Sequence, residues 1–150
     1  MSMSRTLVLG ILLVAFALTP PAVAGGWKTY DEGMAKSWEA IYNTGDDAAV
    51  AAFYTEDGIR MPPNHSAVQG RQAIAAYIKE SREMMVTKVR LETDEVATSG
   101  DMGFARGTYV IIDSEGNEVD NGKWIQVGKR IGGEWYAYRD IWNSDNPLPE

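Results

Sequence analysis

The sequence of 150 residues contains no cysteine and a single histidine, His65. The absence of cysteine excludes disulfides, thiol chemistry and cysteine-ligated metal centres. One histidine cannot form a histidine-rich metal site, and we expect neither a metal nor a cofactor. Basic residues are also few, since 14 Lys and Arg stand against 21 Asp and Glu, which gives a formal net charge of −7. An acidic chain without a basic run binds nucleic acid poorly, so we expect no nucleic-acid partner.

The chain also lacks an apolar run that would span a bilayer comfortably. Its longest run, residues 7–18, holds twelve residues, whereas a membrane helix needs about 20. The run follows a short basic start at Arg5, ends before Pro20, and is followed by a small-x-small cleavage pattern at 22–24. These features are typical of a secretory signal peptide, and the alternative is an uncleaved membrane anchor.

Cleavage after Ala24 would leave one small domain, residues 25–150. We therefore expect a signal peptide over 1–24, a secreted or periplasmic product, and no stable membrane insertion after cleavage. N-terminal sequencing of the exported protein should then begin at Gly25.

The second half of the chain is rich in β-branched and aromatic residues, separated by short turns that contain glycine. This pattern predicts three consecutive antiparallel strands, at 103–113, 117–130 and 134–143. Two segments, 114–116 and 131–133, each fit a three-residue hairpin loop with glycine at the left-handed position.

These loops predict which side chains share a face of the sheet. They place Arg106 opposite Trp124, and Trp124 opposite Asp140. One face then mixes aromatic rings with charged and polar groups, which favours a pocket because a pure core would bury charge at high cost. An exposed polar face or a subunit interface are the alternatives, and a one-residue slip would exchange the two faces. The predicted pocket face carries Phe104, Arg106, Thr108, Trp124, Gln126, Tyr138, Asp140 and Trp142. The opposite face carries Ala105, Gly107, Tyr109, Ile125, Val127, Trp135, Ala137 and Ile141.

The first half of the chain predicts helices at 27–43, 46–54 and 70–84, because apolar residues recur there at spacings of three and four. A short strand is expected at 59–61 and a further strand at 85–99. Helices first and a run of strands afterwards indicate an α+β fold, with helices packed on one face of a curved antiparallel sheet.

Residues 45–78 carry the pattern GD-x-x-A-x-x-x-x-Y-x-x-D-G, then a proline, then GR-x-x-I-x-x-Y. With the ending G-x-W and D-x-W-N-S, residues 27–144 resemble the SnoaL-like and ketosteroid-isomerase-like proteins of the nuclear transport factor 2 superfamily. The resemblance implies a cone in which a curved sheet wraps against three helices, with a pocket running into the core. It also implies that Trp38 and Tyr54 are walls of that pocket, and that its strand positions match the predicted pocket face.

The catalytic residues of ketosteroid isomerases have no counterparts here. The resemblance places Pro62 or Met61 at the position of the isomerase Asp base, Trp38 at its oxyanion Tyr, and Gln126 at its protonated Asp. Limonene-epoxide hydrolases share the fold and use an Asp–Arg–Asp arrangement, of which only an Arg and one Asp are present.

Three functions are open at this point. In the first, which we favour, the aromatic-lined pocket binds a small hydrophobic or amphipathic molecule. Arg106 would then bind a carboxylate or carbonyl, and Asp140 would orient Arg106 through a direct or water-bridged contact inside the cone. In the second, the protein is a lyase, isomerase or hydrolase with Asp140 as general base beside Arg106, which requires a raised pKa for Asp140. In the third, the opposite face makes an oligomerisation domain. We expect a homodimer through that face.

Overall fold

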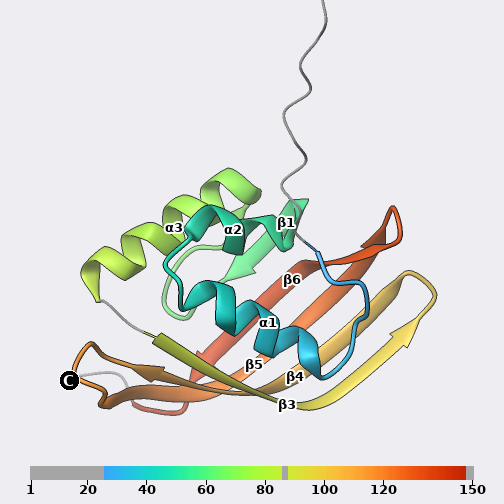
Figure 1. The fold of residues 1–150 in the computed structure, drawn as a ribbon. Coiled ribbons are helices and arrows are strands. Elements are labelled where there is room, and N and C mark those ends of the chain that lie inside the picture. The colour runs from blue at the N-terminus through green and yellow to red at the C-terminus, as the bar shows by residue number, and fades with distance from the viewer. Residues whose placement is uncertain (1–25, 86–87, 148–150) are drawn as a thin grey trace, which may run out of the picture.

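The computed structural model describes residues 26–85 and 88–147. Figure 1 shows helices gathered on one side of a curved sheet. The elements are α1 (Gly33–Tyr42), α2 (Asp47–Ala52), β1 (Tyr54–Met61), β2 (Val68–Gln69), α3 (Arg71–Met84), β3 (Lys88–Ser99), β4 (Met102–Ile112), β5 (Glu118–Ile131) and β6 (Glu134–Ser144). The predicted signal peptide and its cleavage after Ala24 lie outside the described residues and stay predictions. Within those residues, none of the helices is both long and apolar enough to cross a membrane.

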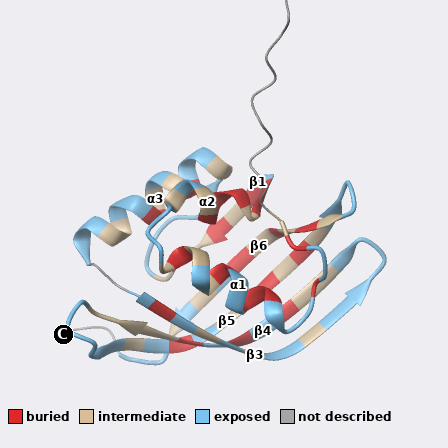
Figure 2. Ribbon diagram, in the orientation of Figure 1, coloured by how far each residue is buried: buried red, intermediate tan, exposed pale blue. Residues whose placement is uncertain are grey.

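The sheet has six strands in the order β2-β1-β6-β5-β4-β3. Strands β3 to β6 form a continuous antiparallel meander, while β1 lies parallel to β6 and pairs antiparallel with β2 on its other side. The predicted α+β fold, with a curved sheet against three helices, is therefore confirmed, although the sheet is not purely antiparallel because β1 and β6 are parallel. Figure 2 shows that buried segments of the strands lie beneath the helices, so the core and any pocket must lie between these two layers.

Helix α1 begins at Gly33, later than the sequence pattern indicated. Trp27 belongs instead to an isolated β-bridge, in which its backbone exchanges hydrogen bonds of 2.9 and 2.8 Å with Trp135. The Asp31 side chain then accepts a 2.9 Å hydrogen bond from the Gly33 N–H. That bond satisfies one of the free amides at the start of a helix.

The segment between α1 and α3 differs from expectation mainly in its strands. Asp46 caps α2 as predicted, by accepting a 2.9 Å hydrogen bond from the Ala49 N–H. Strand β1 begins at Tyr54 rather than at Ile59, and the short strand β2 lies inside the segment expected to be a loop. The early start of β1 matters for the site, because it brings Tyr54 and Arg60 onto one strand.

The two hairpin loops of the meander have different lengths. The first is the predicted three-residue loop, with a 2.9 Å hydrogen bond from the Asp113 N–H to the Asn117 carbonyl and φ 91° at Gly116. The second loop has two residues, because Ile131 pairs directly with Glu134. Gly132 and Gly133 have φ of 60° and 86°, and two positive φ values are what a two-residue type I′ turn requires.

Bulges shift the strand register away from the predicted one. Strand β5 has an extra residue, Val119, between its pairings with Ile111 and Ile112. Gly107 therefore lies opposite Trp124, in the place predicted for Arg106. A second extra residue, Tyr138 on β6, restores the parity that the shorter second loop had shifted. Trp124 therefore pairs with Trp142 and not with Asp140, but it shares a face with Asp140 as predicted. The face prediction was thus wrong for β4 and right for Trp124, Gln126, Asp140 and Trp142, and it was wrong for Tyr138 and for Trp135, which is buried in the core.

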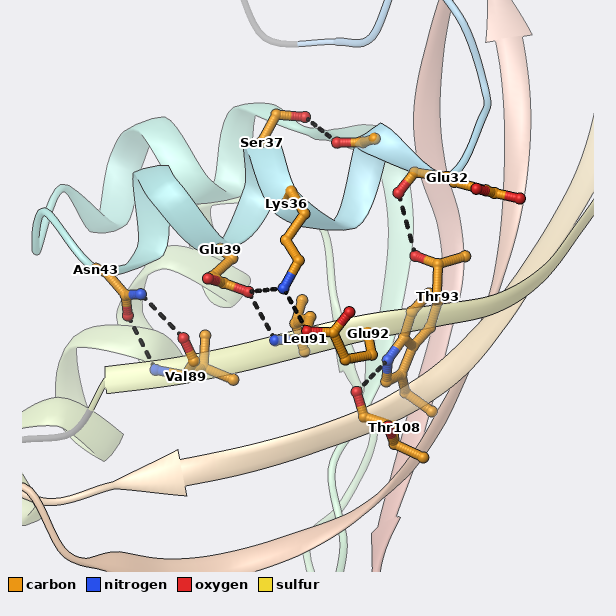
Figure 3. Close-up of polar contacts among 12 residues, drawn as sticks. Glu32, Lys36, Ser37, Glu39, Asn43, Val89, Leu91, Glu92, Thr93 and Thr108 are labelled. Carbon is orange, nitrogen blue, oxygen red and sulfur yellow. Dashed lines mark hydrogen bonds and ion pairs between the residues drawn. The ribbon is translucent and has the colours of Figure 1, made fainter.

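Helix α1 is attached to the edge strand β3 by side chains that replace a neighbouring strand (Figure 3). The Asn43 amide accepts from the Val89 N–H and donates to the Val89 carbonyl, both at 2.9 Å. The Glu39 carboxylate accepts a 2.7 Å hydrogen bond from the Leu91 N–H. An edge strand covered in this way offers fewer unpaired backbone groups to other chains, and its attachment fixes the distance between α1 and the sheet.

Candidate functional site

A cavity of about 230 Å³ lies between the helices and the concave face of the sheet. Both layers of the molecule contribute, since α1, α3 and strands β1, β3, β4, β5 and β6 each supply lining residues. Most of the wall is apolar, with polar groups contributed by Arg60, Ser81, Gln126 and Asp140. Its aromatic side chains are Trp27, Trp38, Tyr42, Tyr77, Tyr109, Trp124 and Trp142.

A buried Arg–Tyr–Asp cluster occupies one side of this cavity. Arg60 Nη1 donates a 2.7 Å hydrogen bond to the Tyr54 hydroxyl, which donates a 2.6 Å hydrogen bond to Asp140 Oδ2. The direct distance from Arg60 Nη1 to Asp140 Oδ2 is 3.8 Å. All three side chains are buried, so the opposite charges compensate each other where water cannot. Parallel pairing of β1 with β6, with Arg60 as the register partner of Asp140, brings the cluster together.

Aromatic rings surround the Arg60 guanidinium. Its Cζ lies 4.5 Å from the ring centroid of Trp142 and 5.4 Å from that of Trp38. Tyr54 and Tyr77 lie at 5.9 Å each. A guanidinium held against ring faces gains cation–π attraction, which offsets part of the cost of burying the charge.

Burial raises the pKa of Asp140, while the charge of Arg60 and the hydrogen bond from Tyr54 lower it and offset part of that rise. Burial likewise raises the pKa of Tyr54 well above its ordinary value, so its hydroxyl keeps its proton. The Tyr30 hydroxyl lies 3.3 Å from Gln126 Oε1 and 3.2 Å from the Gln126 carbonyl. Gln126 is thereby held beside Asp140, its register partner on the next strand.

The structure brings five of the predicted pocket residues to the cavity. They come from α1, β5 and β6, and they are Trp38, Trp124, Gln126, Asp140 and Trp142. Tyr54, predicted as a wall, lies behind the lining, where it joins Arg60 to Asp140. In the part of the chain that the structure describes, no group of three or more Asp, Glu or His side chains is placed to hold a metal ion.

Besides Tyr54, four predicted pocket residues do not line the cavity, namely Phe104, Arg106, Thr108 and Tyr138. The first three alternate along β4 with the buried residues Ala105, Gly107 and Tyr109. The bulge in β5 shifts the register of β4 by one residue, which exchanges the two predicted faces of β4. Tyr138 is the extra residue of the β6 bulge, and its ring lies between Lys129 and Arg139.

Arg106 does not contact Asp140, contrary to the predicted pair. Its side chain is 51% exposed and pairs with Glu95 at 2.9 Å and Asp94 at 3.2 Å on β3. The predicted buried arginine–aspartate pair exists, but Arg60 supplies the guanidinium.

Arg60 is the residue of the candidate site that the sequence did not predict. It lies between Ile59 and Met61 in a short strand, and a single charge there is equally typical of a solvated edge. Tyr54 and Arg60 are six residues apart, but a register irregularity between Tyr54 and Ile59 interrupts the alternation of β1, so period-two spacing did not predict that they meet.

The family model of the SnoaL-like domain matches residues 35–138, a span that runs from α1 to β6. It includes most of the cavity lining, with Trp27 before it and Asp140 and Trp142 just after it. Comparison with curated protein sequences gives no match.

Solved structures of three similar proteins share the fold. An NTF2-like protein with a cystatin-like fold from Novosphingobium aromaticivorans is 20% identical, with a TM-score of 0.69 over 78% of this chain and 80% of that one. A domain of unknown function from Nostoc punctiforme is 16% identical, with a TM-score of 0.68 over 78% and 76%. A ketosteroid isomerase-like protein from Erwinia carotovora atroseptica is 23% identical, with a TM-score of 0.60 over 79% and 100%. At these identities the likeness shows the fold alone.

Proposed function

The chain belongs to the SnoaL-like domain family, and from that premise we propose that it binds a small, largely apolar molecule in the cavity between helices and sheet. The observation that carries this proposal is the composition of the cavity wall, in which seven aromatic side chains surround a few buried polar groups. Ligand sites commonly combine an apolar wall with a small number of fixed polar groups. A volume of about 230 Å³ lies just below the usual range of roughly 300–1,000 Å³, which favours a ligand of one or two rings.

A neutral aromatic probe, 2-naphthylmethanol, tests the proposal without involving charge. We expect saturable binding by isothermal calorimetry, and we expect Ser81→Trp to weaken it about tenfold or more, because a large ring at this lining position fills the cavity. Glu80→Trp is the matched control, since Glu80 is the preceding residue of α3, exposed and outside the lining. Equal binding by the wild type and Ser81→Trp would place the probe elsewhere and contradict the proposal.

Acid–base catalysis by Asp140 is the second candidate function. Two observations favour it: burial raises the pKa of Asp140, and no described residue donates a hydrogen bond to its Oδ1. A carboxyl group of this kind suits proton transfer near neutral pH better than an exposed one does. Asp140→Asn should then retain ligand binding but lose turnover, whereas a pure binding module shows no turnover in the wild type.

We also propose a homodimer through the face of the sheet opposite the helices. Ile125 and Ile141 are register partners on β5 and β6, and they are 44% and 43% exposed. Two exposed isoleucines side by side form an apolar patch that a second copy could cover. Val127, predicted for the same contact, is half-buried on that strand, whereas Trp135 is buried in the core.

Ile125→Glu is expected to shift the protein from dimer to monomer in light scattering at micromolar concentration, because a charge in the patch resists burial. Ile131→Glu is the matched control, since Ile131 is 48% exposed at the hairpin end of the same strand. A wild-type protein that is monomeric at all concentrations tested would remove this proposal and leave ligand binding unaffected.

A further inference from the structure

Arg60 has more hydrogen-bonding capacity than the described protein uses. Its guanidinium carries five N–H donors. Among the described residues, it donates one hydrogen bond, from Nη1 to the Tyr54 hydroxyl. Arg60 Nε is buried without a partner among the described residues, and so is Nε1 of Trp38, another lining residue. An unsatisfied buried donor costs free energy. Arg60 lines the cavity, and its Nη2 has no hydrogen bond to a described residue, which favours a ligand that brings hydrogen-bond acceptors.

The aromatic surroundings of Arg60 decide the charge of that ligand. Aromatic cages commonly attract cations, but here Arg60 itself occupies the cage, with Cζ 4.5 Å from the Trp142 ring centroid. A cationic ligand would be repelled by the guanidinium, and a neutral ligand would gain hydrogen bonds but no attraction between opposite charges. A carboxylate would gain both from the guanidinium.

We propose that the cavity selects a flat, apolar carboxylic acid, bound as the carboxylate by Arg60 with uptake of a proton by Asp140. The apolar body of the ligand lies between the aromatic walls of the cavity. This inference rests on the proposed function and adds the chemical class of the ligand to it.

The proton uptake follows from the charge balance of the cluster. Arg60 Nη1 already lies 3.8 Å from Asp140 Oδ2, so one guanidinium would face two carboxylates after binding. Two carboxylates in one buried site are not both ionised, because each disfavours the charge of the other. Oδ1 of Asp140 receives no hydrogen bond from a described residue, and a proton from solvent can attach there.

Among the titratable groups of this cluster, Asp140 is the one whose charge changes when the ligand binds. From β1 it meets Arg60 and Tyr54, and Tyr30, which precedes α1, is coupled to it electrostatically. From α3, Tyr77 faces the same guanidinium. Burial raises the pKa of Tyr30 and of Tyr54, so both keep their protons near neutral pH. Burial also raises the pKa of Asp140, and a bound carboxylate would raise it further.

Three probes with one ring system test the ligand class by calorimetry: 2-naphthoate, 2-naphthylmethanol and 2-naphthamide. We expect the wild type to bind 2-naphthoate about tenfold or more tighter than either neutral probe near pH 6, because only the carboxylate adds attraction between opposite charges to its hydrogen bonds with Arg60. Arg60→Met should abolish the preference. Arg106→Met, a matched change at an exposed arginine outside the cavity, should keep it.

Calorimetry in two buffers of different ionisation enthalpy measures the proton. The wild type should take up about one proton per 2-naphthoate and none with 2-naphthylmethanol. Its affinity for 2-naphthoate should fall as pH rises from about 6 to 8, because binding takes up a proton and the proton concentration is lower at higher pH. Asp140→Asn should show neither the uptake nor this pH dependence.

The outcomes separate this inference from the proposed function. If the wild type binds 2-naphthylmethanol but prefers it to 2-naphthoate or shows no preference, the ligand class is wrong and the binding function stands. If none of the three probes binds, both are wrong. Tight binding of 2-naphthoate without proton uptake overturns the role of Asp140. If Arg60→Met does not fold, the preference and proton uptake of the wild type decide the question.

Discussion

Replacing Asp140 with alanine is expected to lower the free energy of unfolding by about 3–5 kcal/mol, because it leaves Arg60 as a buried charge without its counter-ion. The change also removes the acceptor of the 2.6 Å hydrogen bond from Tyr54. A triple variant, Tyr54→Phe with Arg60→Met and Asp140→Leu, removes the whole polar cluster and keeps similar volume. It should recover most of the lost stability, since replacing a buried ion pair by apolar residues is often neutral or stabilising.

Arg106→Ala is the control for this prediction. Arg106 pairs with Glu95 and Asp94 on the surface, with a side chain that is 51% exposed, and exposed pairs contribute roughly 0–1 kcal/mol. Urea denaturation of the wild type and the variants gives the comparison. A loss below about 1 kcal/mol for Asp140→Ala would contradict the buried cluster. A triple variant as unstable as the single one would show that uncompensated charge is not the cause.

Gly107→Ala is expected to destabilise the fold by about 3 kcal/mol or more, through a steric clash in the sheet. A Cβ atom at Gly107 would lie 1.8 Å from the Glu92 carbonyl oxygen and 3.0 Å from Thr93 Cα. Both neighbours are backbone atoms of β3, so no side-chain rotation relieves the overlap. The clash falls beside the bulge that follows Thr93, where bulges increase strand bending. The bent edge of the sheet supplies Leu91 to the cavity wall.

The adjacent residue gives the control, since Thr108 is exposed on the outer face. Thr108→Ala should change the free energy of unfolding by less than about 1 kcal/mol. If Gly107→Ala unfolds at the same urea concentration as Thr108→Ala, the close approach of β3 and β4 at this point is wrong.

Elements with long, strongly patterned segments could be predicted from the sequence. The 70–84 helix and the strands of the meander lie within a few residues of their expected bounds, because spacing and turn residues determine them locally. The first helix was predicted too long. Its apolar stripe begins with Trp27, but this residue pairs with the distant Trp135, and local periodicity carries no information about such a partner.

The faces of the sheet were only partly predictable because register errors accumulate along hairpins. A single bulge residue, Val119, moved Arg106 from the cavity side to the outer face. On β6, an error in loop length and a bulge cancelled, so Asp140 was placed on the correct face. Bulges depend on sheet curvature and on packing across layers, which neighbouring residues in sequence do not encode.

Arg60 could not be identified as the partner of Asp140 because their strands are parallel neighbours far apart in the chain. A hairpin turn predicts which antiparallel residues face each other, whereas a parallel pair is set by the whole path between its strands. The predicted contact of Arg106 with Asp140 was therefore wrong, and the structure places Arg60 beside Asp140 instead.

The most direct test of ligand binding in this cavity is a pair of crystal structures of the protein, equilibrated with 2-naphthoate and with 2-naphthylmethanol. We expect the naphthalene ring between α1 and the sheet, against Trp38 and Trp142, with the carboxylate of 2-naphthoate within hydrogen-bonding distance of Arg60. A cavity that holds only ordered water in both structures, with each probe absent or on the outer face of the sheet, would contradict the proposed function.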